Sequence, residues 1–146
     1  MTTVADSTLT IEDRLAAGDV VRRFFWLVDH GRAAETAALF ARDASLTFGP
    51  GSPRPGTIAS ADIGPAMVAR QAQLNVTTRH VLTEAQTAVN GDGSIAISSL
   101  LTLFRSEDEG RDSYPVSVAD IEDVLVREDG AWRIKTRTIS PVFNRA

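Results

Sequence analysis

The chain has 146 residues, a formal net charge of -4, two histidines and no cysteine. This length suits one domain that can enclose a ligand-sized cavity, so we expect a single domain over 1–146, with 1–9 as a flexible tail. The interspersed charges argue against nucleic-acid and membrane partners, and the absence of cysteine excludes disulfides, thiolate zinc sites and cysteine nucleophiles.

The start of the chain carries no pattern typical of an exported protein. The first twenty residues lack a basic stretch followed by an apolar one. No apolar run anywhere is long enough to span a bilayer. We therefore expect a cytoplasmic location.

The first predicted element is a long helix. Thr10 and Asp13 form a capping-box pattern, although Glu or Gln is more usual than Asp at the second position. Apolar residues then recur at helical spacing, which predicts a helix from Ile11 to Asp29 that ends before Gly31. Strong helix formers over 33–41 predict a short second helix.

A strand, a loop and a third helix are expected next. The strand runs from Ala44 to Phe48. The segment from Gly49 to Gly56 holds three prolines and three glycines, so it is neither helix nor central strand. We expect this loop to form the mouth of a pocket. Ser60 and Asp62 begin a third helix that continues to about Leu74.

From Thr77 onward, apolar and polar residues alternate in four long runs. The runs are separated by turn signals at 90–93, 107–110 and 129–130. This pattern predicts an antiparallel meander. Helices followed by a meander indicate an α+β domain, with the helices packed on one face of a curved antiparallel sheet.

Asp29 and His80 stand out as candidates for proton transfer. Histidine ordinarily titrates near neutral pH, and this chain has only two. Asp29 ends the first helix, where a carboxylate is unfavourable against the helix dipole unless a cation offsets it. About fifty residues separate Asp29 from His80, so spacing alone leaves open whether they touch.

Four motifs in this order and spacing resemble those of one family. They are the helix ending in Asp-x-Gly at Asp29, the run from Leu39 to Ala44, Thr-Arg-His at 78–80, and the last strand from Gly130 to Arg137. Together they resemble the SnoaL-like branch of the nuclear transport factor 2-like superfamily, over about Leu9 to Val142. The resemblance implies a cone-shaped fold, with three N-terminal helices on a strongly curved antiparallel sheet around an apolar pocket. It also implies a homodimer formed through the outer face of the sheet.

The resemblance further implies roles for individual residues. Scytalone dehydratase, bile-acid 7α-dehydratase and lindane dehydrochlorinase of this superfamily use an Asp-His dyad, whose positions match Asp29 and His80 here. In such a dyad the carboxylate orients the imidazole, which acts as a general base toward carbon. Arg137 matches an arginine that reaches the pocket in some of these enzymes, where it would hold an oxyanion or a leaving group.

The chain departs from these enzymes at the end of the first helix. The dehydratases place tyrosines there and the dehydrochlorinase a lysine, whereas this chain has only apolar residues over 24–28. Tyr114, the only tyrosine, either replaces the missing donor or packs in the third strand of the meander. The expected substrate contacts are large apolar residues of a continuous core and pocket: Phe24, Phe25, Trp26, Phe48, Met67 and Phe104.

Each candidate also has a structural interpretation. Asp29 can be a solvated carboxylate at a helix end, and His80 a histidine bonded within the core. Arg137 can pair with a surface carboxylate. The acidic run over 120–123 alternates between the two faces of a strand, and we interpret it as a solvated face or the rim of a dimer.

We expect no cofactor and no metal, since the chain has no helical His-x-x-x-His, nucleophile elbow or phosphate-binding loop. With the resemblance, the leading hypothesis is a cofactor-independent lyase or isomerase of the dehydratase or cyclase type. It would abstract a proton from a small hydrophobic substrate. Two alternatives stay open: a non-catalytic ligand-binding or oxygenase-small-subunit-like protein, and an epoxide hydrolase.

Overall fold

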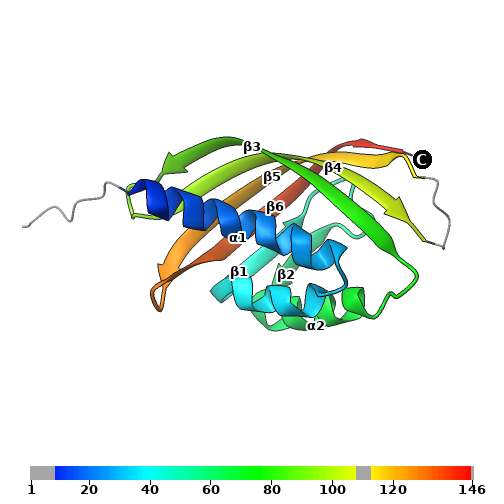
Figure 1. Ribbon diagram of the computed structural model, residues 1–146, viewed down its shortest axis with the longest axis horizontal. Helices are drawn as coiled ribbons and strands as arrows, with labels where there is room; N and C mark the ends of the chain where they lie inside the picture. Colours follow the sequence, from blue (N-terminus) through cyan, green and yellow to red (C-terminus); the bar gives the residue numbers. More distant parts are fainter. Residues whose placement is uncertain (1–8, 108–112, 146) are drawn as a thin grey trace, which may run out of the picture.

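The computed structural model describes residues 9–107 and 113–145 (Figure 1). The predicted tail, except for Leu9, and most of the turn expected at 107–110 lie outside the described residues. No helix in the described part of the chain is long and apolar enough to cross a membrane. In chain order the elements are α1 (Ile11–Asp29), the 3-10 helix η1 (Ala33–Leu39), β1 (Phe40–Phe48), β2 (Gly56–Ala59), α2 (Ser60–Gln71), β3 (Thr77–Val89), β4 (Ile95–Ser106), β5 (Pro115–Glu128) and β6 (Ala131–Asn144).

The strands form one six-stranded sheet in the order β2-β1-β6-β5-β4-β3. Strands β3 to β6 are the expected meander, since each pairs antiparallel with the next along the chain. The pair of β1 with β6 is parallel. In Figure 1, α1 runs across the long curved strands, while η1 and α2 lie beside β1 and β2. The predicted α+β fold, with three helices on a curved sheet, is confirmed.

The first turn of α1 is held by its own cap and by the sheet. The Thr10 side chain accepts from the Asp13 backbone, and the Asp13 carboxylate accepts from the Thr10 backbone, which confirms the capping box. The same carboxylate accepts hydrogen bonds from Trp132 Nε1 at 3.2 Å and from Arg127 Nη2 at 3.1 Å. At the far end, Gly31 turns the chain away with a φ of 74°. Asp13 thus ties the start of α1 to the β5–β6 hairpin.

The segment after α1 differs from its prediction. The second helix is of the 3-10 type and ends at Leu39, so β1 begins at Phe40 and not at Ala44. Phe40 is buried in the core and pairs with Ile134 of β6, and this packing outweighs the helix propensity of the neighbouring residues. The pairing then shifts around Asp43, whose φ is 55°.

The proline-rich segment is a loop as expected, but its last residue, Gly56, begins the short strand β2. The loop packs against the end of β6. The Gly49 N–H donates to the Ile139 carbonyl at 2.8 Å, and Asn144 Nδ2 donates to the Gly51 carbonyl at 2.9 Å. Its hydrogen bonds therefore reach β6 and not the end of α1 where Asp29 lies. The third helix also ends three residues earlier than predicted, at Gln71.

A β-bulge in β6 decides which of its residues face the core. The pairing of β5 with β6 passes over Lys135, which is left as an extra residue in β6. Strict alternation from Trp132 and Ile134 would turn Arg137 outward. Because of the bulge, Arg137 is buried on the same side as these two residues and lies opposite Asp123 of β5.

Candidate active site

Asp29 and His80 are in contact. Asp29 ends α1, and His80 lies near the start of β3, which packs against α1 (Figure 1). His80 Nδ1 lies 2.5 Å from Asp29 Oδ1, and the His80 backbone N–H donates to Asp29 Oδ2 at 2.7 Å. Both side chains are largely buried, with 5% of Asp29 and 14% of His80 exposed. The fold therefore joins two residues that lie far apart in the sequence.

The Asp29 carboxylate has a third donor, the Thr78 hydroxyl, at 2.7 Å from Oδ1. Burial acts to raise the pKa of Asp29. The hydrogen bonds and charge of His80, together with the Thr78 hydroxyl, outweigh burial and hold this pKa below its usual range. An ionised carboxylate only accepts hydrogen bonds, so we assign the imidazole proton to His80 Nδ1.

This assignment leaves His80 Nε2 with the lone pair that a general base needs. Within the described residues, no hydrogen bond reaches Nε2. The ring of Phe25 lies beside the imidazole, with the two ring centroids 4.9 Å apart. Asp29 thus holds His80 through hydrogen bonds, and Phe25 provides an apolar neighbour for the imidazole ring.

Arg137 forms a second, fully enclosed ion pair. Its Nε and Nη2 donate to the two carboxylate oxygens of Asp123 at 2.6 and 3.1 Å, and both side chains are fully buried. The guanidinium carbon also lies 4.4 Å from the ring centroid of Phe24 and 4.8 Å from that of Phe25. Arg137 Nη1 is buried and has no described partner. The interpretation of the 120–123 run as a solvated face or dimer rim is therefore wrong for Asp123.

The structure places three of the predicted site residues away from the dyad. Trp26 lies on the outer side of α1, 63% exposed and stacked on His30. Tyr114 precedes β5, is 52% exposed, and lies under the Arg145 guanidinium. Phe104 pairs with Arg79 on β3, so it lies on the face of the sheet opposite to His80. The expectation that these three residues join the pocket is corrected.

The other predicted apolar contacts belong to the core that continues from the dyad. Phe24 and Phe25 are buried and meet edge to face, with ring centroids 5.1 Å apart. Phe48 and Met67 are partly buried and pack against the same core. Their role as substrate contacts stays a prediction.

A pocket of about 450 Å³ opens next to Asp29, between the ends of α1 and α2. Val28 and Asp29 line it from α1, and Val68 and Arg70 line it from α2. Its volume lies within the usual range for small-molecule sites. In the described part of the chain, no group of three or more His, Asp or Glu side chains could hold a metal ion.

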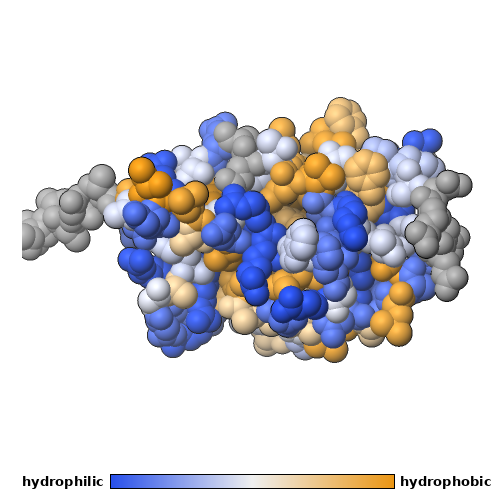
Figure 2. Space-filling model, in the orientation of Figure 1, coloured by the Kyte–Doolittle hydropathy of each residue, from blue (hydrophilic) through white to orange (hydrophobic). Residues whose placement is uncertain are grey.

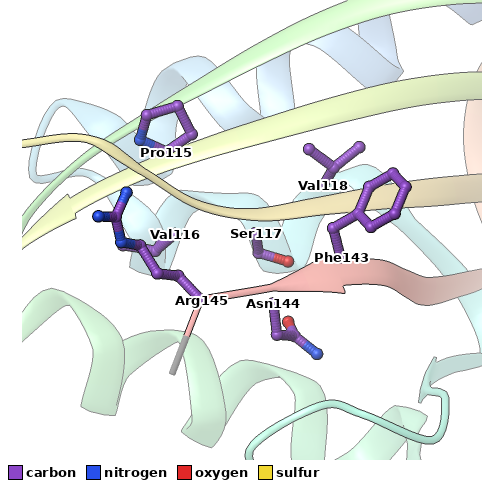
Figure 3. A pocket seen from close by; sticks show the side chains of 7 residues that line it. All are labelled: Pro115, Val116, Ser117, Val118, Phe143, Asn144 and Arg145. Carbon is purple, nitrogen blue, oxygen red and sulfur yellow. The ribbon is translucent and has the colours of Figure 1, made fainter.

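A second pocket, of about 340 Å³, lies at the start of β5 and the end of β6 (Figure 3). Figure 3 shows Val118 and Phe143 next to each other on these strands, with Pro115 and Arg145 further along toward the start of β5 and the end of β6. Neither Asp29 nor His80 lines this pocket. It is therefore separate from the dyad.

Sequence reasoning missed three residues, one in an ion pair and two beside the Asp29–His80 pair. Thr78 and Arg70 were not singled out, although the Thr-Arg-His motif contained Thr78. Asp123 belongs to the run that we interpreted as a solvated face or the rim of a dimer. The sequence did contain a signal for the burial of Asp123, because strand alternation places it on the same face as Ile121 and Leu125. A carboxylate on a buried strand face needs a cationic partner.

The fold places the chain in a class of α+β proteins, those with the nuclear transport factor 2-like fold. Within this class the chain belongs to the SnoaL-like family, because the model of the SnoaL-like domain matches residues 9–138. The family resemblance seen in the sequence is thereby confirmed. No functionally curated protein matches the chain.

Solved structures share this fold at low sequence identity. ActVI-ORFA from Streptomyces coelicolor is 20% identical over 88% of this chain and 96% of that one, with a TM-score of 0.72. A putative scytalone dehydratase from Novosphingobium aromaticivorans is 16% identical, covering 92% and 87%, with a TM-score of 0.75. The beta subunit of a putative aromatic-ring-hydroxylating dioxygenase from the same organism is 19% identical, covering 90% of each chain, with a TM-score of 0.73. At these identities the likeness establishes the fold and not the activity.

Proposed function

We propose that the protein is a cofactor-independent lyase or isomerase in which His80 abstracts a proton from carbon. The observation that carries this proposal is the 2.5 Å contact between His80 Nδ1 and Asp29 Oδ1, which leaves Nε2 as the basic nitrogen. A positioned general base of this kind contributes about 10²–10⁴-fold to a rate. The negative charge of Asp29 stabilises the imidazolium that forms.

The chemistry of the proposal limits the substrate. Neutral imidazole is a weak base, so the carbon-hydrogen bond must be acidified by a neighbouring carbonyl group. The apolar surroundings of His80 favour a small, largely apolar carbonyl compound. After abstraction, the imidazolium returns the proton to another carbon in an isomerisation, or gives it to a departing oxygen in an elimination.

Arg137 remains a proposed stabiliser of the developing oxyanion, through Nη1. Asp123 already occupies the other two donor nitrogens. Because Arg137 is fully buried, a substrate oxygen reaches Nη1 only from inside the cone, beside Phe24 and Phe25. Tyr114 has no place in the proposal, since it lies outside the dyad's surroundings.

Hydrogen exchange at carbon tests the proposal before a substrate is known. A panel of bicyclic ketones is incubated in D₂O with the protein, and NMR follows loss of the α-hydrogen signal. We expect exchange above the buffer rate, and a loss of about 100-fold or more in His80→Ala. His30→Ala, at the exposed end of α1, is the matched control and should exchange at the wild-type rate. If His80→Ala keeps more than about a tenth of the rate, the assignment of the base is wrong.

A second candidate is a subunit or ligand carrier without chemistry of its own. It is favoured by the apolar side chains that gather along the upper edge of the molecule in Figure 2. Val81, Leu100 and Phe143 are each more than half exposed, and strand pairing links Val81 to Phe143 across the outer face through Thr102 and Val118.

We propose that this outer face joins two copies of the chain. Light scattering of Phe143→Asp against wild type tests the dimer, and a dimeric variant would contradict it. Co-purification with a large oxygenase subunit, with no ketone exchange, would favour the second candidate over the enzyme.

A further inference from the structure

The pocket beside Asp29 has an apolar wall and one cationic side chain. Val28, Val68, Leu74 and Val76 supply apolar surface, and Arg70 enters from the last turn of α2. Arg70 is half-buried, and within the described residues no carboxylate forms an ion pair with it. A partly buried guanidinium without a carboxylate partner has N–H donors that can bind an anion.

Two other charged side chains, Arg105 and Asp29, lie near Arg70. Burial lowers the pKa of Arg70, and the nearby Arg105 guanidinium lowers it further, while Asp29 offsets part of the effect. Arg105 in turn pairs with Glu107, at 3.3 Å. Arg105 thus has a carboxylate partner of its own, whereas no ion pair in the described residues includes Arg70.

Arg70 is also connected to the dyad. Its Nη2 donates to Thr78 Oγ1 at 3.0 Å, and Thr78 donates to Asp29 Oδ1 at 2.7 Å, the same oxygen that contacts His80. This bond uses one of the guanidinium's N–H groups and leaves Nε and Nη1 for a ligand. Both Asp29 oxygens accept hydrogen bonds from Thr78 and His80, and in the described residues none joins Asp29 directly to Arg70.

We propose that Arg70 binds the anionic group of a small ligand, a carboxylate or a phosphate, whose apolar part lies against the valine and leucine wall. The ligand's charged group is then held one hydroxyl away from Asp29. That this ligand is the substrate rests on the proposed function. The substrate would then be a carbonyl compound that carries an acidic group. The binding itself is independent of turnover.

Matched probes test the binding. Calorimetric titrations use 2-naphthoate, its neutral analogue 2-naphthamide, and 2-naphthyl phosphate. We expect wild type to bind at least one anion more tightly than the amide, and Arg70→Met to weaken that anion about tenfold or more while leaving the amide unchanged. The relative affinity of the two anions identifies the group. Arg14→Met, an exposed arginine on the first turns of α1, should bind like wild type.

Two results would overturn the inference: equal binding of anions and amide by wild type, or equal anion affinity in Arg70→Met and wild type. If Arg70→Met fails to fold, two other measurements decide. The anion affinity of wild type should fall with added salt while the amide affinity does not. Arg70→Lys, which keeps the charge without the planar fork, should bind the anion with intermediate strength. Ketone exchange without Arg70-dependent binding removes this inference alone, whereas Arg70-dependent binding without exchange removes only the proposed function.

Discussion

Two carboxylate pairs touch the same aromatic side chain and have different surroundings. Asp123 and Arg137 meet in the middle of the sheet, fully buried, with the arginine over Phe24 and Phe25. Asp29 and His80 meet at the end of a helix, beside a pocket, and His80 also contacts Phe25. The two pairs use similar short contacts, so contact geometry does not separate them. Access to a ligand does, because Asp29 lines the pocket of about 450 Å³ whereas the Asp123–Arg137 pair is fully buried. We therefore expect loss of the enclosed pair to affect stability most, and we propose the chemical role for the open pair.

The enclosed pair should show the largest effect on stability. Arg137→Met leaves the Asp123 charge buried without a partner, and we expect a loss of about 3–5 kcal/mol in the free energy of unfolding. Urea denaturation followed by circular dichroism measures it. The double variant with Asp123→Leu removes both charges and should recover most of the loss. A single variant within about 1 kcal/mol of wild type would show that the pair is not structural.

The open pair should show its effect on chemistry. Asp29→Asn can no longer fix the imidazole proton on Nδ1, and we expect ketone exchange to fall by about 100-fold. Nitrogen NMR of the His80 ring should show a change in which nitrogen carries the proton. Asp19→Asn changes an exposed aspartate on the same helix and should match wild type in both measurements. Unchanged exchange in Asp29→Asn would remove Asp29 from the proposed mechanism.

The open pair should also contribute to the pH dependence of stability. The pKa of folded Asp29 lies below its ordinary value of 3.8, so the folded state releases this proton more readily than the unfolded chain. The stabilisation is complete above pH 3.8 and is lost as pH falls through the lower folded pKa. Unfolding free energies of wild type and Asp29→Asn, measured against pH, should therefore converge in this acidic range. A difference that does not change with pH would contradict the lowered pKa.

The smallest effect is expected outside both pairs. Trp26 is mostly exposed and stacks on His30, so Trp26→Ala should cost no more than about 0.5 kcal/mol. Thermal denaturation and ketone exchange should both stay close to wild type. A large loss of ketone exchange in Trp26→Ala would instead support the prediction from the sequence that Trp26 contacts the substrate.

Local signals predicted much of the fold. The capping box and the helical spacing located α1 to the residue, and the Gly-containing turns located the meander. The second helix was overextended because Phe40 belongs to a strand whose partner, β6, lies about ninety residues further along the chain. Pairing at that distance leaves no mark in local propensity.

The candidate site was less accessible to sequence reasoning. The contact of Asp29 with His80 depends on how α1 crosses β3, and only the family resemblance suggested it. Arg137 faces inward because of the bulge at Lys135, which alternation alone would not reveal. Arg70 and Thr78 lie on either side of the short connection from α2 to β3, and their hydrogen bond depends on how that connection turns, which residue types alone do not reveal.

The helix α1 is attached to the sheet at both of its ends. Its nineteen residues begin at the Asp13 carboxylate, bonded to Trp132 and Arg127, and end at the Asp29 carboxylate, bonded to Thr78 and His80. Because the helix is continuous, a displacement of its first turn would also shift its last turn. The place of Asp29 beside His80 therefore depends on both attachments of α1, one to the β5–β6 hairpin and one to the start of β3.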